Sequence, residues 1–152
     1  MERAMSQLPY LSDTILVVDD EPMYLEWLAD YLTSKGLRVK FSENADDALA
    51  LSRAATYRAY IIDLNMPASD GLKSDPRNRT SLDKEYPGLI VARTIRTAGV
   101  SGARVIVYSV YVSEPLYDEV KRLGCTFVQK GRPRVIKEQI EEVLRTDPRK
   151  AP

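Results

Sequence analysis

Apolar residues occur in short runs separated by polar turns, and four of these runs predict β-strands. The four runs are Ile15–Val18, Tyr60–Leu64, Arg104–Ser109 and Thr126–Gln129. The first three are almost continuously apolar, as expected for parallel strands that are covered by helices on both faces. Leu37–Ser42 instead alternates apolar and polar residues, which predicts a fifth strand at an edge of the sheet with one face in water.

Between these runs, apolar residues recur with the period of an α-helix. After Pro22, the spacing i, i+3, i+4, i+7, i+8 predicts a helix that ends at Gly36. Pro133 is expected to open the last helix, whose apolar residues share one stripe. Three further helices are predicted, namely a short one capped by Asn44, one over Leu89–Ala98 and one over Glu114–Leu123.

The resulting order, a strand followed by a helix five times, predicts an α/β fold. It is a doubly wound, five-stranded parallel sheet with helices on both faces. The length of 152 residues, with 44% hydrophobic and 29% charged residues, is typical of one globular domain. We expect its core to span about residues 14–145, between short flexible tails. Residues 67–87 break the pattern, because this segment is polar, rich in turn residues and has no helical stripe. At about 20 residues it exceeds the usual connection between a strand and a helix, so it is predicted to be a functional lid or disordered.

Composition excludes several classes of function. Lys and Arg number 22, as do Asp and Glu, so we expect no direct binding to nucleic acid or to an anionic membrane. The sequence contains no histidine, which excludes Ser-His and Cys-His catalytic pairs and imidazole metal ligands from this chain. The single cysteine, Cys125, allows no internal disulfide and suits a reducing, cytoplasmic compartment. No stretch is apolar over the length that spans a membrane.

Polar side chains that can carry chemistry follow four of the predicted strands. Asp19 and Asp20 follow the first strand and Asp63 the central one, while Ser109 and Lys130 stand at the ends of the last two. The carboxyl ends of parallel strands meet at one edge of the sheet, so we expect these side chains to lie together. Neighbouring carboxylates repel each other by about 4 kcal/mol at 4 Å in a surface-like dielectric. One lysine does not balance three of them, and a hard divalent cation such as Mg²⁺, or alternatively Mn²⁺, would.

Such a site favours phosphoryl transfer to a carboxylate. Asp63 is the best candidate nucleophile because it stands alone at the end of the central strand, whereas Asp19 and Asp20 are better placed as metal ligands. Lys130 would neutralise one phosphoryl oxygen and the Ser109 hydroxyl would donate a hydrogen bond to another. Each residue also has an ordinary structural interpretation, since the two adjacent aspartates, for example, could simply cap the following helix.

The segments ILVVDDEP, YIIDLNMP, VIVYS and FVQKG occur in this order along the chain. Together they give the chain a resemblance to the response regulator receiver domain, the phosphorylatable module of two-component signalling. The resemblance covers about residues 14–145 and implies a single receiver domain over residues 1–152, with a flavodoxin-like sheet of order 2-1-3-4-5. It implies that Asp63 accepts a phosphoryl group from a sensor histidine kinase or a histidine phosphotransfer protein, as in a phosphorelay.

The resemblance also implies how the site residues divide the work. Asp20, Asp63 and the backbone carbonyl of Asn65 would hold Mg²⁺, and Asp19 would act through a water molecule. Once Asp63 is phosphorylated, Ser109 and the lysine at the end of the fifth strand would grip the phosphoryl group.

Switching in the family couples a movement of the hydroxyl residue, here Ser109, to an aromatic side chain on the fifth strand, here Phe127. Asn65 and Tyr111 would border the phosphoryl group and tune its lifetime. The resemblance places the output surface on the fourth and fifth helices and the fifth strand. This surface would contact a downstream protein or form a homodimer.

Three features depart from the family pattern. Gly131 replaces the usual proline after the lysine, so the expected cis peptide is in doubt, and Val110 occupies a position that is usually Ala or Gly. The segment 67–87 is about 17 residues longer than the family's short turn, whether Gly71 or Gly88 is aligned with the glycine of that turn. We expect the surplus to shield the acidic pocket or to select partners.

Because the chain ends after the fifth helix, we expect a stand-alone phospho-acceptor switch that is not a turnover enzyme. Two other functions remain open. One is a receiver-like interaction module that does not need phosphate. A second is a Mg²⁺-dependent phosphohydrolase with an aspartyl-phosphate intermediate, although Asn65 stands where that chemistry usually has a general acid. A nucleotide-binding flavodoxin-like protein is disfavoured, since no glycine-rich loop follows the first strand.

Overall fold

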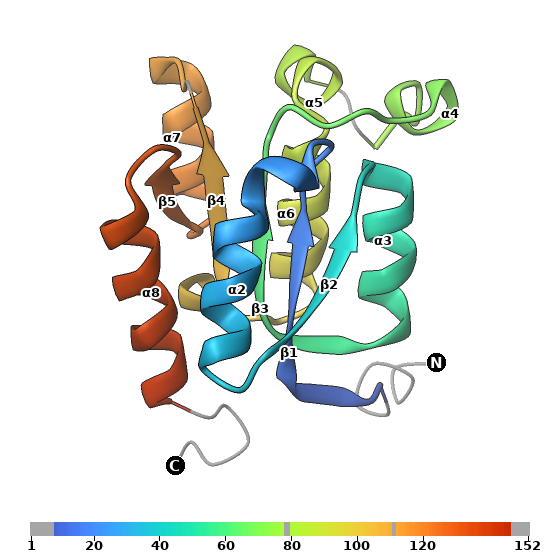
Figure 1. Cartoon of the computed structure of the whole chain (residues 1–152). Helices are drawn as coiled ribbons and strands as arrows, with labels where there is room; N and C mark the ends of the chain where they lie inside the picture. The colour runs from blue at the N-terminus through green and yellow to red at the C-terminus, as the bar shows by residue number, and fades with distance from the viewer. Residues whose placement is uncertain (1–7, 78–79, 111, 147–152) are drawn as a thin grey trace.

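A computed structural model describes residues 8–77, 80–110 and 112–146 of the chain. Its centre is a parallel sheet with the strand order β2-β1-β3-β4-β5 (Figure 1). The strands are β1 (Tyr10–Val18), β2 (Arg38–Ser42), β3 (Thr56–Ile62), β4 (Val105–Ser109) and β5 (Thr126–Gln129). The α/β class expected from the sequence and the strand order implied by the resemblance are both confirmed.

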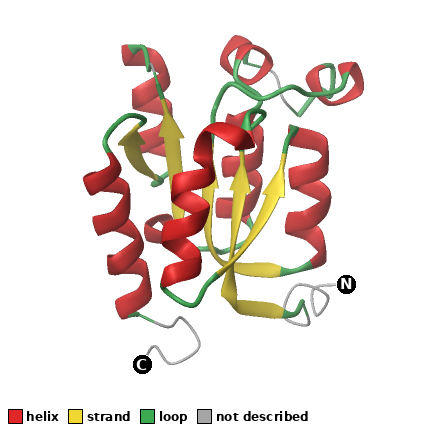
Figure 2. Cartoon of the chain, in the orientation of Figure 1, coloured by secondary structure: helices red, strands yellow, loops and turns green. Residues whose placement is uncertain are grey.

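Helices cover both faces of the sheet (Figure 2). The α-helices are α2 (Glu26–Ser34), α3 (Ala45–Ala54), α4 (Asp70–Lys73), α5 (Ser81–Glu85), α6 (Gly88–Thr97), α7 (Glu114–Arg122) and α8 (Pro133–Arg145). Two short 3-10 helices, η1 (Pro22–Leu25) and η2 (Gly102–Arg104), precede α2 and β4.

Successive residues of a strand point to opposite faces, and this alternation divides the core into layers. Ile15 and Val17 of β1 pack with α2 and α8, whereas Leu16 and Val18 pack with α3 and α6. A third cluster joins α6 and α7 to the end of the sheet. Because both faces of β1 are buried, its apolar run is continuous, as the sequence indicated.

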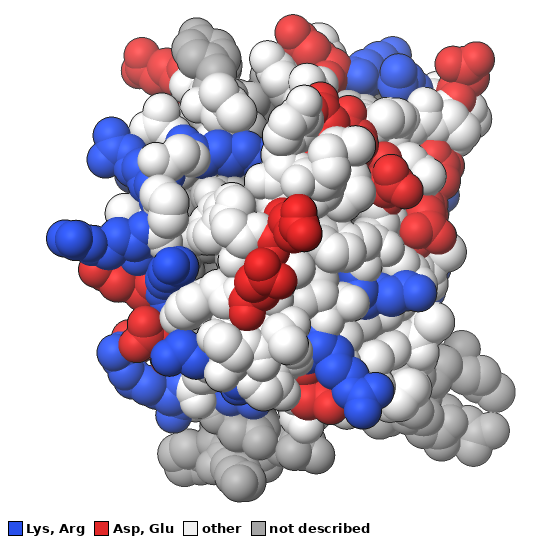
Figure 3. Space-filling model, viewed as in Figure 1, with Lys and Arg blue, Asp and Glu red and all other residues white. Residues whose placement is uncertain are grey.

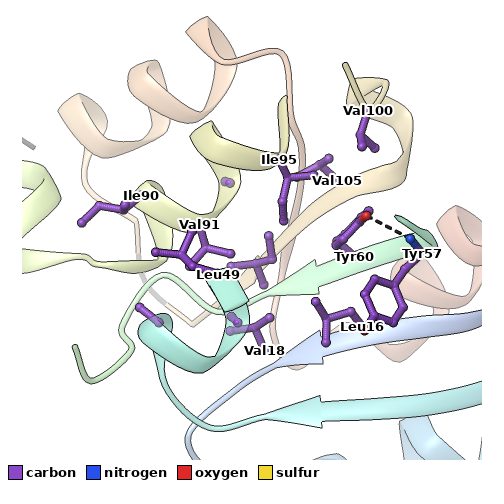
Figure 4. Close-up of a cluster of buried hydrophobic side chains, with 14 of the residues drawn as sticks. Leu16, Val18, Leu49, Tyr57, Tyr60, Ile90, Val91, Ile95, Val100 and Val105 are labelled. Carbon is purple, nitrogen blue, oxygen red and sulfur yellow. Dashed lines mark hydrogen bonds between the residues drawn. The ribbon is translucent and has the colours of Figure 1, made fainter. Parts of the chain in front are cut away.

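Figure 4 shows the cluster between the sheet, α3 and α6. Leu49 of α3 and Val91 of α6 contribute to it from the helices. The hydroxyl oxygen of Tyr60 accepts a hydrogen bond of 2.9 Å from the backbone N–H of Tyr57. Tyr60 is therefore buried without leaving its polar atom unpaired.

The predicted helices are confirmed with shifts of a residue or two at their ends, except that the first turn after Pro22 is the 3-10 helix η1 and α2 begins only at Glu26. The side chain of Asn44 caps α3 by accepting a hydrogen bond of 2.7 Å from the N–H of Asp47, and Ser113 caps α7 in the same way. Two strands begin earlier than predicted, β1 at Tyr10 and β3 at Thr56, because these first residues pair with each other.

The segment 67–87 contains two short helices, α4 and α5, although its sequence shows no helical stripe. Ser69 caps α4 and Thr80 caps α5, each accepting a hydrogen bond of 3.1 Å from the backbone N–H three residues later. Each helix is shorter than two turns, so neither could produce the repeated apolar spacing that marks a helix in a sequence. Figure 1 shows both helices beyond the ends to which the strand arrows point.

The molecule carries charges of both signs, in keeping with its zero net charge. In Figure 3, Lys and Arg side chains gather on the side of α8, and Asp and Glu side chains lie in the middle and at the upper right. No helix among the described residues combines the length and the apolar character needed to cross a membrane.

Gly88, the first residue of α6, lies against the chain that leaves β3. Its N–H donates a hydrogen bond of 3.0 Å to the carbonyl of Leu64. A Cβ atom at this position would overlap the backbone carbonyl of Asp63 and would lie 2.6 Å from the Cα of Leu64. Gly71, the other candidate for the family's turn glycine, has no such neighbour.

We predict that Gly88→Ala destabilises the protein, since the added methyl group must push α6 away from β3. Overpacking of this kind costs about 1–3 kcal/mol of unfolding free energy. Urea unfolding followed by circular dichroism measures the change.

Gly71→Ala is the matched control. A Cβ there meets nothing closer than the Ser69 hydroxyl oxygen at 3.9 Å, and alanine favours helix, so this variant should be as stable as the wild type or slightly more so. Equal stability of the two variants would contradict the steric explanation.

Candidate functional site

The register of the sheet brings two aspartates together. Val18 of β1 pairs with Ile62 of β3, so the next residues, Asp19 and Asp63, leave the sheet side by side. The N–H of Asp63 donates a hydrogen bond of 2.9 Å to the carbonyl of Val18, which extends the pairing by one residue. Asp19 is 2% exposed and Asp63 is 9% exposed.

The register between β4 and β5 places Lys130 at the same edge. Ser109 pairs with Gln129, and the N–H of Lys130 then donates a hydrogen bond of 2.9 Å to the carbonyl of Ser109. From there the Lys130 ammonium donates hydrogen bonds to Oδ2 of Asp19, at 2.6 Å, and to Oδ2 of Asp63, at 3.0 Å. Lys130 is thus in direct contact with Asp19, which precedes it by 111 positions, and with Asp63, which precedes it by 67 positions.

The remaining carboxylate oxygens accept local hydrogen bonds. Oδ1 of Asp19 accepts one of 2.8 Å from the N–H of Glu21, and Oδ1 of Asp63 accepts one of 3.2 Å from the N–H of Asn65. The ordinary interpretation of the two aspartates as caps of the following helix was wrong, because Glu21 precedes η1 and no side chain caps that helix. Asp19 instead orders the turn before η1 through its hydrogen bond from the Glu21 N–H. The same side chain stabilises the turn with one oxygen and contacts Lys130 with the other.

Three carboxylates crowd this edge. Oxygens of Asp19, Asp20 and Asp63 lie within 4.8 Å of one another. Burial raises the pKa of Asp63 above its ordinary value, although the charge of Lys130 and its hydrogen bond act in the opposite direction. Burial would lower the pKa of Lys130, but its hydrogen bonds and its attraction to the two aspartates outweigh that effect and raise it. Lys130 therefore stays charged beside the acids.

The donor set fits a hard divalent cation. With all three carboxyls ionised and Lys130 protonated, the cluster has two net negative charges, which one divalent ion balances. Carboxylate oxygens are the ligands that Mg²⁺ and Mn²⁺ prefer, and Mg²⁺ commonly keeps several water molecules beside one or two carboxylates. Asn65 lines the same pocket. The resemblance to receiver domains implies its backbone carbonyl as a further ligand.

The cluster forms the floor of an open pocket of about 490 Å³. It is lined by the predicted site residues Asp19, Asp20, Asp63, Asn65, Ser109 and Lys130. The structure thus brings together all of the predicted phosphoacceptor, metal and phosphoryl-binding residues. Ser109 is 5% exposed, at the end of β4, and Val110 beside it is 66% exposed on the rim.

Sequence reasoning missed two aromatic residues of this pocket, Tyr24 and Tyr86. Tyr24 belongs to η1 and is 70% exposed. Tyr86 comes from the segment 67–87, directly before Pro87 and Gly88. One signal was available, since the helix after a parallel strand starts near the carboxyl end of that strand, so Tyr86 had to lie near this edge.

Two further predicted site residues are the switch residue Phe127 and the lifetime-tuning residue Tyr111. Phe127 of β5 is half-buried and packs edge-to-face against Tyr117 of α7, with ring centroids 5.6 Å apart and an interplanar angle of 82°. It also contacts the cluster of α6 and α7, so it connects the sheet to α7. Tyr111 lies outside the described residues.

Gly131 follows Lys130 with a φ of 87°, a left-handed conformation that favours glycine. The chain turns here toward α8, which begins at Pro133. No peptide bond within the described ranges is cis, so the family's cis bond after the lysine is not present here.

Comparisons with known proteins agree with this geometry. A sequence model described as the response regulator receiver domain matches residues 15–77. The transcriptional regulatory protein ResD of Bacillus subtilis is 39% identical over 59 residues, which are 39% of this chain and 25% of ResD. A response regulator receiver protein of Anaeromyxobacter is 39% identical over 56 residues, which are 37% of this chain and 24% of that protein. The match therefore spans about a quarter of the curated relatives.

Solved structures extend the similarity over most of the chain. A CheY-like receiver domain of Methanospirillum hungatei superposes with a TM-score of 0.67 at 21% identity, covering 91% of this chain and 95% of that one. TrrA of Thermotoga maritima, a response regulator solved with Mg²⁺ and BeF, gives a TM-score of 0.64 at 26% identity, covering 86% of this chain and 98% of TrrA. The resemblance to response regulator receiver domains is thereby confirmed, in sequence for the first half of the chain and in fold for most of it.

Without a bound cation, we predict that Asp63→Asn stabilises the protein at pH 7. The raised pKa of Asp63 means that folding favours its neutral form, so the stability associated with that form is present at low pH and is lost as the pH rises through the folded pKa. The neutral amide avoids this loss. Each kcal/mol by which the substitution increases the free energy of unfolding corresponds to a rise in melting temperature of about 2–4 °C for a chain of this size.

The gain should shrink as the pH falls and vanish below 3.8, the ordinary pKa of the carboxyl. Saturating Mg²⁺ should reverse the order at pH 7, because it stabilises the wild type by about 2.7 kcal/mol at 100 times its Kd. Thermal melts in chelator and in Mg²⁺ over this pH range measure both effects. A gain that does not depend on pH would contradict the role given to the buried carboxylate.

Proposed function

We propose that this chain is a phospho-acceptor switch of two-component signalling, in which Asp63 accepts the phosphoryl group. The single observation that carries the proposal is the contact of Asp63 with Lys130 at 3.0 Å, within 4.8 Å of two further carboxylates in an open pocket. The donor is a phosphohistidine of a sensor kinase or of a histidine phosphotransfer protein. Asp63 is buried enough to be held rigidly, yet the pocket leaves it open to a donor from solution.

The transfer exchanges one bond to phosphorus for another. An oxygen of the Asp63 carboxylate forms a bond to phosphorus while the bond between phosphorus and the donor imidazole nitrogen breaks, and the imidazole keeps the electron pair. Mg²⁺ would be held by Asp20, Asp63 and the backbone carbonyl of Asn65, with Asp19 acting through a water molecule, and would neutralise negative charge on the phosphoryl oxygens. Lys130 then exchanges its hydrogen bond to Asp63 for one to a phosphoryl oxygen, and the Ser109 hydroxyl donates to another.

The same residues provide a route from the site to a surface. Once Ser109 turns toward the phosphoryl group, it leaves space at the end of β4, beside β5. Phe127 of β5 packs against Tyr117 of α7, so a shift of the phenyl ring changes the surface formed by α7, β5 and α8. Phe127 has no hydroxyl, so packing alone carries this signal. A downstream protein, or a second copy of the chain, would recognise the altered surface.

Asn65 bears on the choice between this switch and a phosphohydrolase. Its backbone N–H contacts Asp63, and its side-chain amide cannot act as a general acid or base at neutral pH. The site therefore has a nucleophile and charge neutralisation but no proton donor at the position expected for rapid turnover. Slow loss of the phosphoryl group to water is what this arrangement supports.

We predict that incubation with acetyl phosphate and Mg²⁺ adds one phosphoryl group to the wild type, measured by intact mass. Asp63→Asn should abolish the gain, and a chelator should do the same. Asp118→Asn, an exposed aspartate of α7, is the matched control and should gain the group as the wild type does.

Beryllofluoride with Mg²⁺ separates the switch from the phosphate-independent module. The wild type should respond with a change in tryptophan fluorescence or in the NMR spectrum, and Asp63→Asn should not. If the wild type neither gains mass nor responds to beryllofluoride, the phosphate-independent interaction module is the better description.

A further inference from the structure

The segment between β3 and α6 is attached to the rest of the molecule by a buried ion pair. Asp83 of α5 is 1% exposed, and both of its carboxylate oxygens accept hydrogen bonds from the guanidinium of Arg93 of α6, at 2.5 and 3.1 Å. Two parallel bonds of this kind set the orientation as well as the distance of the two groups. A buried carboxylate is unfavourable unless it is paired, so α5 has one strongly preferred position on α6.

The pair also reaches the next helix. A guanidinium nitrogen of Arg93 lies 3.7 Å from Oε2 of Glu119 in α7. Glu119 also accepts two hydrogen bonds from the guanidinium of Arg122. The interactions therefore run from α5 through α6 to α7. Leu82, next to Asp83, packs against the apolar cluster that α6 and α7 share, which adds a second attachment.

Tyr86 extends from this attachment into the pocket. Its N–H donates a hydrogen bond of 2.7 Å to the carbonyl of Leu82, so it continues the last turn of α5. Its side chain packs against the cluster that contains Leu64 and Leu89 and also lines the pocket that holds Asp63. The position of α5 thus determines where the Tyr86 ring stands.

We propose that Tyr86 forms a fixed wall of the pocket that limits the access of water to a phosphoryl group on Asp63, and that Asp83 is the positioning residue that holds this wall. The inference rests on the proposed function and adds to it what sets the lifetime of the phosphorylated state. It gives the segment 67–87 a specific role.

The step that the wall retards is hydrolysis. A water oxygen forms a bond to phosphorus, the bond between phosphorus and the Asp63 oxygen breaks, and the carboxylate keeps the electron pair. Inorganic phosphate and a proton leave to solvent. The Tyr86 ring occupies part of the space through which a water molecule reaches the phosphorus atom. Fewer water molecules are then placed for attack. The slower hydrolysis comes from the bulk of the aromatic ring and not from its hydroxyl group, because the residues against which Tyr86 packs are apolar.

The test measures loss of the phosphoryl group after acetyl phosphate is removed, with Mg²⁺ present throughout. Tyr86→Ala should lose the group faster than the wild type by roughly three- to tenfold, a modest change in the activation barrier. Tyr86→Phe keeps the ring and should lose it at the wild-type rate. Asp83→Asn should accelerate the loss in the same direction as Tyr86→Ala, because one of the two bonds to Arg93 is weakened.

Asp75→Asn is the matched control for Asp83→Asn. Asp75 lies in the same segment and pairs with Arg77, but this pair is at the surface and does not line the pocket of Asp63. Its loss rate should equal that of the wild type. Melting temperatures of all variants establish that each is folded at the assay temperature.

The double variant Asp83→Asn with Tyr86→Ala separates positioning from a general loss of structure. If Asp83 acts through Tyr86, the double variant loses the group no faster than Tyr86→Ala alone. Additive effects, an unchanged rate in Tyr86→Ala, or equal acceleration by Asp75→Asn would each overturn the inference while leaving the proposed function intact. Failure of the wild type to gain a phosphoryl group would instead overturn the proposed function.

Discussion

The repulsion among three carboxylates at one edge of the sheet is the constraint on which the rest of the site depends. Asp19 and Asp63 cannot move apart without breaking the pairing of β1 with β3, because the N–H of Asp63 bonds to the carbonyl of Val18. Burial increases the energetic penalty of their charge, and Lys130 relieves only part of it. The folded chain therefore holds an excess of negative charge that a bound cation neutralises. The free energy of cation binding then stabilises the arrangement of the three carboxylates.

Much of this could be predicted because the site follows from the sheet. The apolar runs mark where the strands end, and in a parallel sheet those ends share one edge, so the residues that follow had to meet. The contact between Asp63 and Lys130 is of this kind, although 67 positions separate them. The early starts of β1 and β3 could not be predicted, because Tyr10 and Thr56 extend their strands only by pairing with each other.

The segment between β3 and α6 shows where the sequence falls short. Asp83 stands among polar residues and has the sequence context of a solvated charge, yet it is buried because Arg93 reaches it from another helix. Asp83 and Arg93 are ten residues apart, and nothing in this spacing indicates from the sequence that the two side chains form an ion pair. The helix that carries Asp83 has five residues, too few for a periodic pattern, and its stability comes from tertiary contacts rather than from its own propensity. Tyr86 takes its place in the pocket as a consequence of those contacts.

Gly88 leaves no spare volume between the start of α6 and the chain that leaves β3. Repulsion between touching atoms rises steeply while their attraction is shallow, so such a contact resists compression far more than separation. Displacement of the Asp63 backbone toward α6 is opposed by this steep repulsion, whereas displacement away from α6 is opposed by the hydrogen bond from the Gly88 N–H to the Leu64 carbonyl. The junction between the acidic edge and the start of α6 is therefore stiffer in compression than in extension.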